Sequence, residues 1–318
     1  MAESKKLSPE ILFSNWFKKK GWKAFDFQKQ ALEAYLNGYS GLLNAPTGTG
    51  KTYALWIPIL IEALLSNKKS FKGLHAIWIT PVRALAKDIH SAMIEAAEEL
   101  NMNWDIALRT GDTSLKERQQ QKTKTPNALI TTPESLHLFL ASKEYTKFFA
   151  DLKVIVIDEW HELLGTKRGV QIELALSRLK AINPAIKIWG VSATIGNIEE
   201  ALHVLLGEDI HEAKFKLIRS EVEKKVKTIT VLPDEVERFP WGGHLGITLL
   251  NKILPIIWKG KSTLLFTNTR SQAEIWYQRL LEADPNLAGI IGLHHGSLDL
   301  ELRNWVENAL HDGILKIV

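Results

Sequence analysis

The residues with the clearest chemical potential lie between Leu42 and Thr52, where the chain reads L-L-N-A-P-T-G-T-G-K-T. A short apolar run stops at Asn44, a loop with two glycines follows, and a helical pattern begins at Lys51. A strand, a glycine loop and a helix start together place free backbone N–H groups and the positive end of a helix dipole around an anion. In phosphate-binding loops the lysine reaches the β- and γ-phosphates, and the next hydroxyl binds Mg²⁺. This run therefore predicts a nucleoside triphosphate site.

The loop departs from the strict pattern G-x-x-x-x-G-K-[ST] at one position, because Ala45 stands where that pattern has glycine. The alternative interpretation is an ordinary glycine-rich turn between a strand and a helix. The flanking elements and the Lys51–Thr52 pair favour the phosphate-binding interpretation. The residues expected around the nucleotide in this loop are Ala45, Thr47, Gly48, Thr49, Gly50, Lys51 and Thr52.

A second reactive pair, Asp158 and Glu159, follows the apolar β-branched run Val154–Ile157. In phosphate-loop NTPases, a carboxylate at such a strand end holds Mg²⁺. The adjacent glutamate can orient the attacking water and act as its general base. An acidic turn is the alternative for the pair taken alone, but the pair and the glycine loop together predict hydrolysis of the triphosphate.

Other polar residues also follow apolar runs. Ser192 and Thr194 are candidates for reporting the state of the γ-phosphate, although such hydroxyls also satisfy turn backbone groups. His161 is either a surface residue or a link between the metal site and a neighbouring domain, and local residues alone favour the surface interpretation.

Three further turns, at residues 80–83, 109–112 and 131–134, combine hydroxyl, glycine and arginine groups. Such groups position a nucleic-acid backbone without reading its sequence. Each turn alone is typical of a helix cap, but three turns on one sheet edge favour a shared binding role.

The elements that must position these residues alternate along the chain. Strands are predicted at 42–43, 75–80, 106–109, 128–132, 154–157 and 187–191, and helices at 8–21, 31–36 and 83–100. Nearly continuous apolar strands separated by helices predict an α/β fold with a parallel sheet covered on both faces. Ligands bind beyond the carboxyl ends of the strands in such sheets, and each polar cluster named above falls at such an end.

A second block with the same alternation begins after Gly207. Strands are predicted at 224–232, 262–267, 288–293 and 314–318, and helices before Trp258, at 272–282 and at 300–310. We expect residues 1–208 to form the first domain, 209–246 a connector and the start of the second domain, and 247–318 the rest. Because the chain stops on a buried strand pattern, we expect the second domain to be incomplete.

Composition narrows the classes of function. The 318 residues carry a net charge of +4, which permits a nucleic-acid partner without requiring one. The absence of cysteine excludes disulfide frameworks and thiolate metal sites and fits a reducing cytoplasm. No apolar stretch approaches the ~18–20 residues of a membrane span, and the N-terminus is not that of a signal peptide. We interpret most of the 11 tryptophans as core residues.

The combination of motifs resembles that of the superfamily-two helicases. A-P-T-G-T-G-K-T at 45–52, D-E-W-H at 158–161 and S-A-T at 192–194 are similar to motifs I, II and III of that superfamily. Four further segments resemble motif Ia, motif Ib, motif IV and the turn after motif IV of that superfamily. In this order they are T-P-V-R-A-L-A at 80–86, T-T-P-E-S at 131–135, L-L-F-T-N-T-R at 264–270 and H-H-G-S at 294–297. The residues within these motifs resemble those of Lhr-like helicases. The combination of D-E-W-H-E-L with R-F-P-W-G-G-H-L-G (238–246) most resembles the bacterial ligase-associated DEXH-box branch.

This resemblance implies two RecA-like parallel-sheet P-loop domains in tandem, the second incomplete, with ATP and Mg²⁺ bound to the first. It implies that Gln28 contacts adenine. The implied catalytic residues are Lys51, Glu159, His161, Ser192 and Thr194, with Thr52 and Asp158 as ligands of Mg²⁺. The implied contacts with a nucleic-acid strand are Arg83, Gly111, Thr132, Pro133, Thr267, Asn268, Arg270, His295 and Gly296.

The resemblance also implies an ATP-dependent helicase or translocase that moves 3′→5′ on single-stranded DNA in DNA repair, with a DNA-repair ligase or nuclease as partner. The family's motif VI supplies an arginine finger, worth roughly 10³–10⁵ in rate for related reactions, and neither it nor motif V is found in this sequence. We therefore expect an N-terminal part that binds ATP–Mg²⁺ but is nearly inert as a motor.

Two alternatives remain open from the sequence. The chain is either an enzyme or a non-catalytic ATP- and nucleic-acid-binding scaffold, and the presence of Lys51–Thr52 together with Asp158–Glu159 favours the enzyme. An RNA helicase would share the same motifs, since only contacts to the 2′-hydroxyl distinguish RNA from DNA at such a site.

Overall fold

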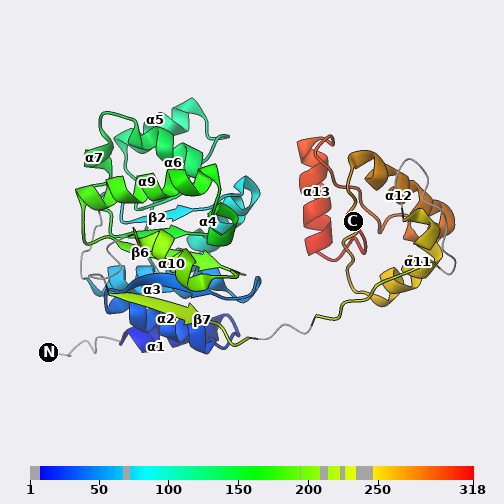
Figure 1. Cartoon of the computed structure of the whole chain (residues 1–318), viewed down its shortest axis with the longest axis horizontal. Coiled ribbons are helices and arrows are strands. Elements are labelled where there is room, and N and C mark those ends of the chain that lie inside the picture. Colours follow the sequence, from blue (N-terminus) through cyan, green and yellow to red (C-terminus); the bar gives the residue numbers. More distant parts are fainter. Residues whose placement is uncertain (1–7, 67–71, 194, 208–213, 223–225, 234–245) are drawn as a thin grey trace. The chain divides into compact units, whose positions relative to one another are not determined.

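The computed structural model describes residues 8–66, 72–193, 195–207, 214–222, 226–233 and 246–318. The chain divides into two compact units, Met1–Lys224 and Lys225–Val318 (Figure 1). The expected run R-F-P-W-G-G-H-L-G lies almost entirely outside the described residues, as does Thr194.

The first unit is built on a seven-stranded parallel sheet with the strand order β3-β4-β2-β5-β6-β1-β7. Its strands are β1 (Ser40–Asn44), β2 (Ala76–Ile79), β3 (Ile106–Arg109), β4 (Ala128–Thr131), β5 (Val154–Ile157), β6 (Lys187–Ser192) and β7 (Phe215–Arg219). The first six fall on the predicted apolar runs, so the predicted α/β fold with a parallel sheet is confirmed.

Helices cover both faces of this sheet because strand side chains alternate between two hydrophobic cores. In β5, Val154 and Val156 join one core, while Ile155 and Ile157 join the other. The helices are α1 (Pro9–Lys19), α2 (Asp26–Leu36), α3 (Lys51–Leu65), α4 (Arg83–Glu99), α5 (Leu115–Thr123), α6 (Pro133–Leu140), α7 (Tyr145–Phe148), α8 (Trp160–Leu163), α9 (Lys167–Ile182) and α10 (Ile198–Leu206). Helices α1 to α4 cover the first core, and α6, α9 and α10 cover the second.

The boundary of the first unit differs from the expected residue 208. Strand β7 pairs in parallel with β1, from Ser40 opposite Phe215 to Asn44 opposite Arg219, so the first unit extends to Lys224. Phe215 is 42% exposed because β7 lies at the sheet edge, and its mixed apolar and basic sequence lacks the continuous apolar run of a buried strand. The strand predicted at 224–232 is wrong over its described part, since residues 226–232 have no regular secondary structure.

The second unit has the predicted helices but much less strand. It contains η2 (Ile247–Leu249), α11 (Leu250–Lys259), α12 (Arg270–Ala283), η3 (Pro285–Leu287) and α13 (Leu300–His311). The strands predicted at 262–267, 288–293 and 314–318 are reduced to two isolated parallel bridges, in which Ile317 pairs with Thr263 and with Ile291. In the first run Leu265 packs against the small core of this unit, whereas Leu264 and Phe266 on either side are 56% and 88% exposed, so only one face of the run is covered.

Candidate nucleotide site

The phosphate-binding loop lies between β1 and α3, as predicted. Gly48 and Gly50 adopt φ values of 76° and 78°, in the left-handed region that residues with a Cβ rarely enter. Gly50 is the N-cap of α3, so the N–H groups of the first helical turn, which helix geometry leaves outside the hydrogen bonds of the helix itself, lie at the loop. The Thr49 hydroxyl donates to the Pro46 carbonyl at 2.7 Å and closes the loop from within.

Gln28 holds this loop from α2. Its amide nitrogen donates to the carbonyls of Thr49 at 3.2 Å and Gly50 at 3.1 Å, while its oxygen accepts from the Phe25 N–H at 2.9 Å. The side chain is only 1% exposed. The structure therefore gives Gln28 a role in positioning the loop, and its expected contact with adenine stays a prediction.

A cavity of about 870 Å³ opens beside the loop. This volume lies within the ~300–1,000 Å³ range of small-molecule sites. The loop residues Thr47 to Thr52 line one part, together with Gln28, Asp158 and Glu159. Ala45 does not line it, because its side chain is buried in the core and its N–H donates to the Ser192 carbonyl at 3.0 Å.

Four aromatic side chains that were not among the predicted site residues also line the cavity. They are Phe17, Trp22, Phe25 and Tyr53. Trp22 is 50% exposed and its ring lies 5.8 Å from that of Tyr53, so it is not a core residue. The available signal was its position between two helices, outside either helical pattern. Flat apolar rings beside a phosphate loop suit a nucleobase.

Asp158 lies at the end of β5, facing the loop across the cavity. It accepts hydrogen bonds from the Trp78 indole at 3.3 Å and from the Glu159 N–H at 2.9 Å. Burial and the neighbouring charge of Glu159 nevertheless raise the pKa of Asp158 to about 6. A buried acid whose charge is only partly offset, beside a phosphate loop, fits a divalent cation, which would supply further positive charge.

Glu159 stands in the left-handed region with φ 46°, although it has a full side chain. Such a conformation is strained by about 1–3 kcal/mol and is concentrated at functional sites. It turns the carboxylate so that one oxygen lies 3.8 Å from Lys51 Nζ and the other 3.5 Å from His161 Nδ1. The same His161 nitrogen is hydrogen-bonded to Ser192 Oγ at 2.9 Å. Four predicted catalytic residues thus form one contiguous chain.

The residues available for a metal are few. Thr52 and Asp158 both line the cavity, as expected for ligands of Mg²⁺. Among the residues that the structure describes, no group of three or more His, Cys, Asp or Glu side chains is arranged to hold a metal ion. Mg²⁺ is usually bound by one or two protein oxygens together with substrate phosphates and water, so Thr52 and Asp158 are its candidate protein ligands.

The candidate nucleic-acid residues of the first unit divide into two kinds. Arg83 is exposed, forms an ion pair with Asp112 at 3.1 Å, and lies so close to Gly111 that a Cβ there would be 2.7 Å from its guanidinium. Thr132 is 2% exposed and caps α6 by accepting from the Ser135 N–H at 3.4 Å. Pro133 is buried as the first residue of α6. In this structure Thr132 and Pro133 serve as a helix start.

The candidates of the second unit lie around the start of α12. Arg270 donates to the Ser297 hydroxyl, and His295 accepts from the Ser297 N–H at 3.2 Å. Gly296 is adjacent, because a Cβ there would lie 3.6 Å from the Arg270 guanidinium. Thr267 donates to the Thr269 carbonyl at 3.1 Å and the Asn268 N–H donates to Gln272 at 3.2 Å, both in the turn before the helix.

Together the parallel sheet, the phosphate loop and the acidic pair define a P-loop NTPase fold of the RecA-like kind. Residues 25–201 match the sequence model of the DEAD/DEAH box helicases, and the chain belongs to this family. The predicted similarity to Lhr-like superfamily-two helicases is confirmed, whereas the ligase-associated branch stays a prediction.

The ATP-dependent helicase Lhr-Core of Sulfolobus acidocaldarius is 36% identical over 98% of this chain and 36% of its own length. That of Saccharolobus solfataricus is 32% identical over 96% of this chain and 36% of its own. The structure of Mycobacterium smegmatis helicase Lhr bound to ssDNA and AMP-PNP matches with a TM-score of 0.75 and 26% identity, covering 98% of this chain and 42% of that one. The chain thus spans about a third of the length of these curated relatives.

No helix in the described part of the chain has both the length and the apolar character needed to cross a membrane.

Proposed function

We propose that this chain is the ATP-binding part of a DNA helicase or translocase that hydrolyses ATP in response to single-stranded DNA. The observation that carries the proposal is the convergence of Lys51, Asp158 and Glu159 on one cavity beside the phosphate loop. A scaffold that only bound nucleotide would not need a strained glutamate aimed at the lysine.

In this proposal, the triphosphate lies on the loop N–H groups and Lys51 offsets the charge of its terminal phosphates. Thr52 and Asp158 would hold Mg²⁺, which supplies further positive charge to the phosphates when it is bound. Glu159 orients a water molecule for in-line attack and accepts its proton. His161 fixes the Glu159 carboxylate and links it to Ser192 at the end of β6.

The nucleobase lies among Trp22, Phe25 and Tyr53 in this proposal. Single-stranded DNA is favoured as the partner because the similar Mycobacterium smegmatis Lhr structure is described as bound to ssDNA. Translocation 3′→5′, a role in DNA repair beside a ligase or nuclease, a magnesium requirement and a cytoplasmic location belong to the same proposal.

The first prediction concerns the Glu159→Gln substitution. Removing the general base should lower ATP hydrolysis at least about 100-fold while leaving ATP affinity within about threefold. ATPase rates with single-stranded DNA, with RNA of the same sequence and without nucleic acid measure the effect, in the longest form of the protein that can be produced. Glu199→Gln, an exposed glutamate on α10, is the matched control. Hydrolysis by Glu159→Gln at the wild-type rate would refute the assignment of the base.

The same measurement on the 318-residue chain tests its capacity as a motor. Because its sequence holds no arginine-finger motif, we expect AMP-PNP binding but turnover reduced by about 10³ or more relative to a form that has one. Robust DNA-stimulated hydrolysis by these 318 residues would contradict this part of the proposal.

A further inference from the structure

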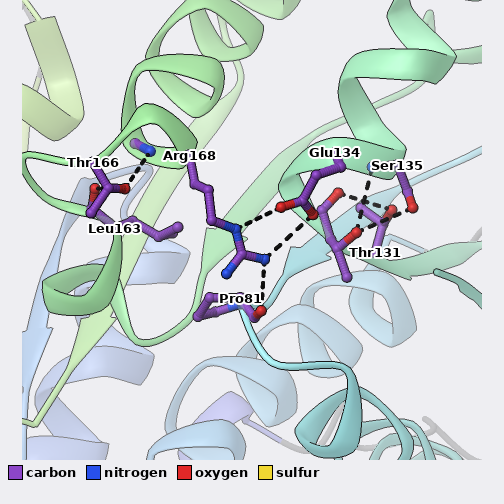
Figure 2. Close-up of polar contacts among 9 residues, drawn as sticks. Pro81, Thr131, Glu134, Ser135, Leu163, Thr166 and Arg168 are labelled. Atoms are coloured by element: carbon purple, nitrogen blue, oxygen red, sulfur yellow. Dashed lines mark hydrogen bonds and ion pairs between the residues drawn. The ribbon is translucent and has the colours of Figure 1, made fainter. Parts of the chain in front are cut away.

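Arg168, which the sequence analysis did not single out, joins three segments that lie far apart in the sequence. Figure 2 shows its guanidinium between the start of α6 and the loop that follows β2. Nε donates to Glu134 Oε1 at 2.6 Å, and Nη2 donates to Glu134 Oε2 at 3.3 Å and to the Pro81 carbonyl at 2.7 Å. One side chain therefore ties α9 to both loops that resemble the strand-binding motifs Ia and Ib.

The same end of α9 is fixed to the segment that carries the acidic pair. Thr166 caps α9 by accepting from the Gly169 N–H at 3.2 Å, and its hydroxyl donates to the Leu163 carbonyl at 2.7 Å. A Cβ at Gly169 would lie 2.2 Å from the Leu163 carbonyl oxygen, so α9 begins in direct backbone contact with the end of α8. Helix α8 starts immediately after Glu159.

The position of Arg168 is not explained by the stability of its own helix. It is the second residue of α9, where a positive charge opposes the helix dipole and is therefore unfavourable. Its side chain is 39% exposed and that of Glu134 is 51% exposed, and an exposed ion pair contributes little to stability. The feature that distinguishes it from such a pair is the additional bond to the Pro81 carbonyl, 87 residues away in sequence.

We propose that Arg168 is a positioning residue that couples nucleic-acid binding at the loops after β2 and β4 to the ATP-hydrolysing loop after β5. The path runs from Glu159 through α8 and the Leu163 carbonyl to the start of α9, and from there through Arg168 to Pro81 and Glu134. Pro81 lies two residues before Arg83, and Glu134 two residues after Thr132. A shift of either loop therefore pulls on the helix that follows the general base.

The inference rests on the proposed function, and its test separates the two. The quantity to measure is the ratio of single-stranded DNA affinities with and without AMP-PNP and Mg²⁺, using a labelled oligonucleotide and the longest form of the protein that can be produced. Because linkage is reciprocal, the same ratio applies to the effect of DNA on AMP-PNP affinity, which provides an internal check.

We expect Arg168→Ala to reduce this ratio by about 3- to 30-fold while AMP-PNP affinity without DNA and basal ATP hydrolysis change less than twofold. Arg178→Ala removes the same charge from the same helix, where Arg178 packs over the Tyr145 ring, and should keep the wild-type ratio. Arg168→Lys keeps the charge but lacks the planar fork, so it should restore only part of the ratio.

An unchanged ratio in Arg168→Ala would overturn the inference, as would an equal loss of AMP-PNP affinity, which would indicate a local structural role. Wild-type behaviour of Arg168→Lys would contradict the bridging geometry. A wild-type protein that binds both ligands without coupling would overturn the inference and leave the proposed binding of both ligands standing. A wild-type protein that binds neither would refute the proposed function itself.

Discussion

Two carboxylates, the partly exposed Glu62 and the buried Asp158, lie near opposite ends of the same parallel sheet, and their surroundings differ. At the amino end, Glu62 accepts from Lys187 at 2.6 Å and from the Tyr35 hydroxyl at 2.7 Å, and lies 3.7 Å from His75. Burial raises the pKa of Glu62, but the pairing with His75 and Lys187 and the Tyr35 hydrogen bond outweigh it and bring that pKa to about 2. At the carboxyl end, the pKa of Asp158 is raised to about 6.

The difference separates a structural network from a functional one. The charge at Glu62 is met by partners within the chain, and the Lys187 ammonium also lies 3.6 Å from the centre of the Tyr35 ring. The charge at Asp158 is offset only in part, because burial outweighs its two hydrogen bonds and the Lys51 charge, and Lys51 also lies 3.8 Å from Glu159. A cavity carboxylate whose charge the chain offsets only in part indicates a bound ligand, whereas a carboxylate whose charge is fully paired within the chain indicates a structural role.

The largest expected effect on stability comes from breaking the satisfied network. Lys187→Met removes the ammonium that lies 2.6 Å from Glu62 and should lower the free energy of unfolding by about 3 kcal/mol, less than for a fully buried pair because Glu62 is partly exposed. Urea unfolding at neutral pH measures the loss. Lys29→Met, which removes an exposed lysine paired with Asp26, should change stability by less than about 0.5 kcal/mol. A similar loss of unfolding free energy in both variants would show that the Glu62 network stabilises the fold no more than an exposed ion pair does.

At the carboxyl end of the sheet, we expect removal of the carboxylate charge to increase the free energy of unfolding. Asp158→Asn removes a buried charge that its neighbours offset only in part, so it should raise the free energy of unfolding near pH 7.5 by about 2 kcal/mol. The same substitution should abolish ATP hydrolysis. The folded-state pKa of Asp158 lies above its ordinary value of 3.8, so its stabilising contribution is complete below that value and is lost as pH rises through about 6.

The advantage of Asp158→Asn over the wild-type chain should therefore grow between about pH 4 and pH 6.5 and then level off. Glu62 acts in the reverse sense, since its contribution is present above pH 4.5 and is lost as pH falls through about 2. If the free energies of unfolding of wild type and Asp158→Asn differed by the same amount at every pH, the Asp158 charge would be fully offset by the chain, against this prediction.

The smallest expected effect on stability concerns Gln28. Like Glu62 it is hydrogen-bonded within the chain, but it lines the nucleotide cavity. Gln28→Ala frees two loop carbonyls and should weaken AMP-PNP binding about tenfold, with a change in unfolding free energy of about 1 kcal/mol. Titration calorimetry with AMP-PNP measures the affinity, and Gln30→Ala, an exposed glutamine on the same helix, is the control. Unchanged affinity would leave Gln28 as a purely structural residue.

The sequence predicts best where one local pattern is sufficient. Each of the first six strands is built on an apolar run, and the end of that run marks the sheet edge where the site forms, so the positions of Lys51 and Glu159 followed directly. Strand β7 was missed because its sequence, F-K-L-I-R, mixes apolar and basic residues and has no continuous apolar run. Trp22 was missed because an aromatic residue in a short connection has no periodicity to distinguish core from cavity. Arg168 was missed because its partners, Pro81 and Glu134, are 87 and 34 residues away.

The edge strand β7 has a mechanical consequence. It is the last strand before the chain leaves the first unit, and it pairs along its whole length with β1, which leads into the phosphate loop. Just past β7, the Ser220 N–H donates to the carbonyl of Asn44, the final residue of β1, at 2.8 Å. Tension along the chain from the second unit that pulls β7 along its axis shears all of these bonds at once instead of opening them one by one. The strand that leads into the nucleotide loop is thus also the strand through which such tension enters the sheet.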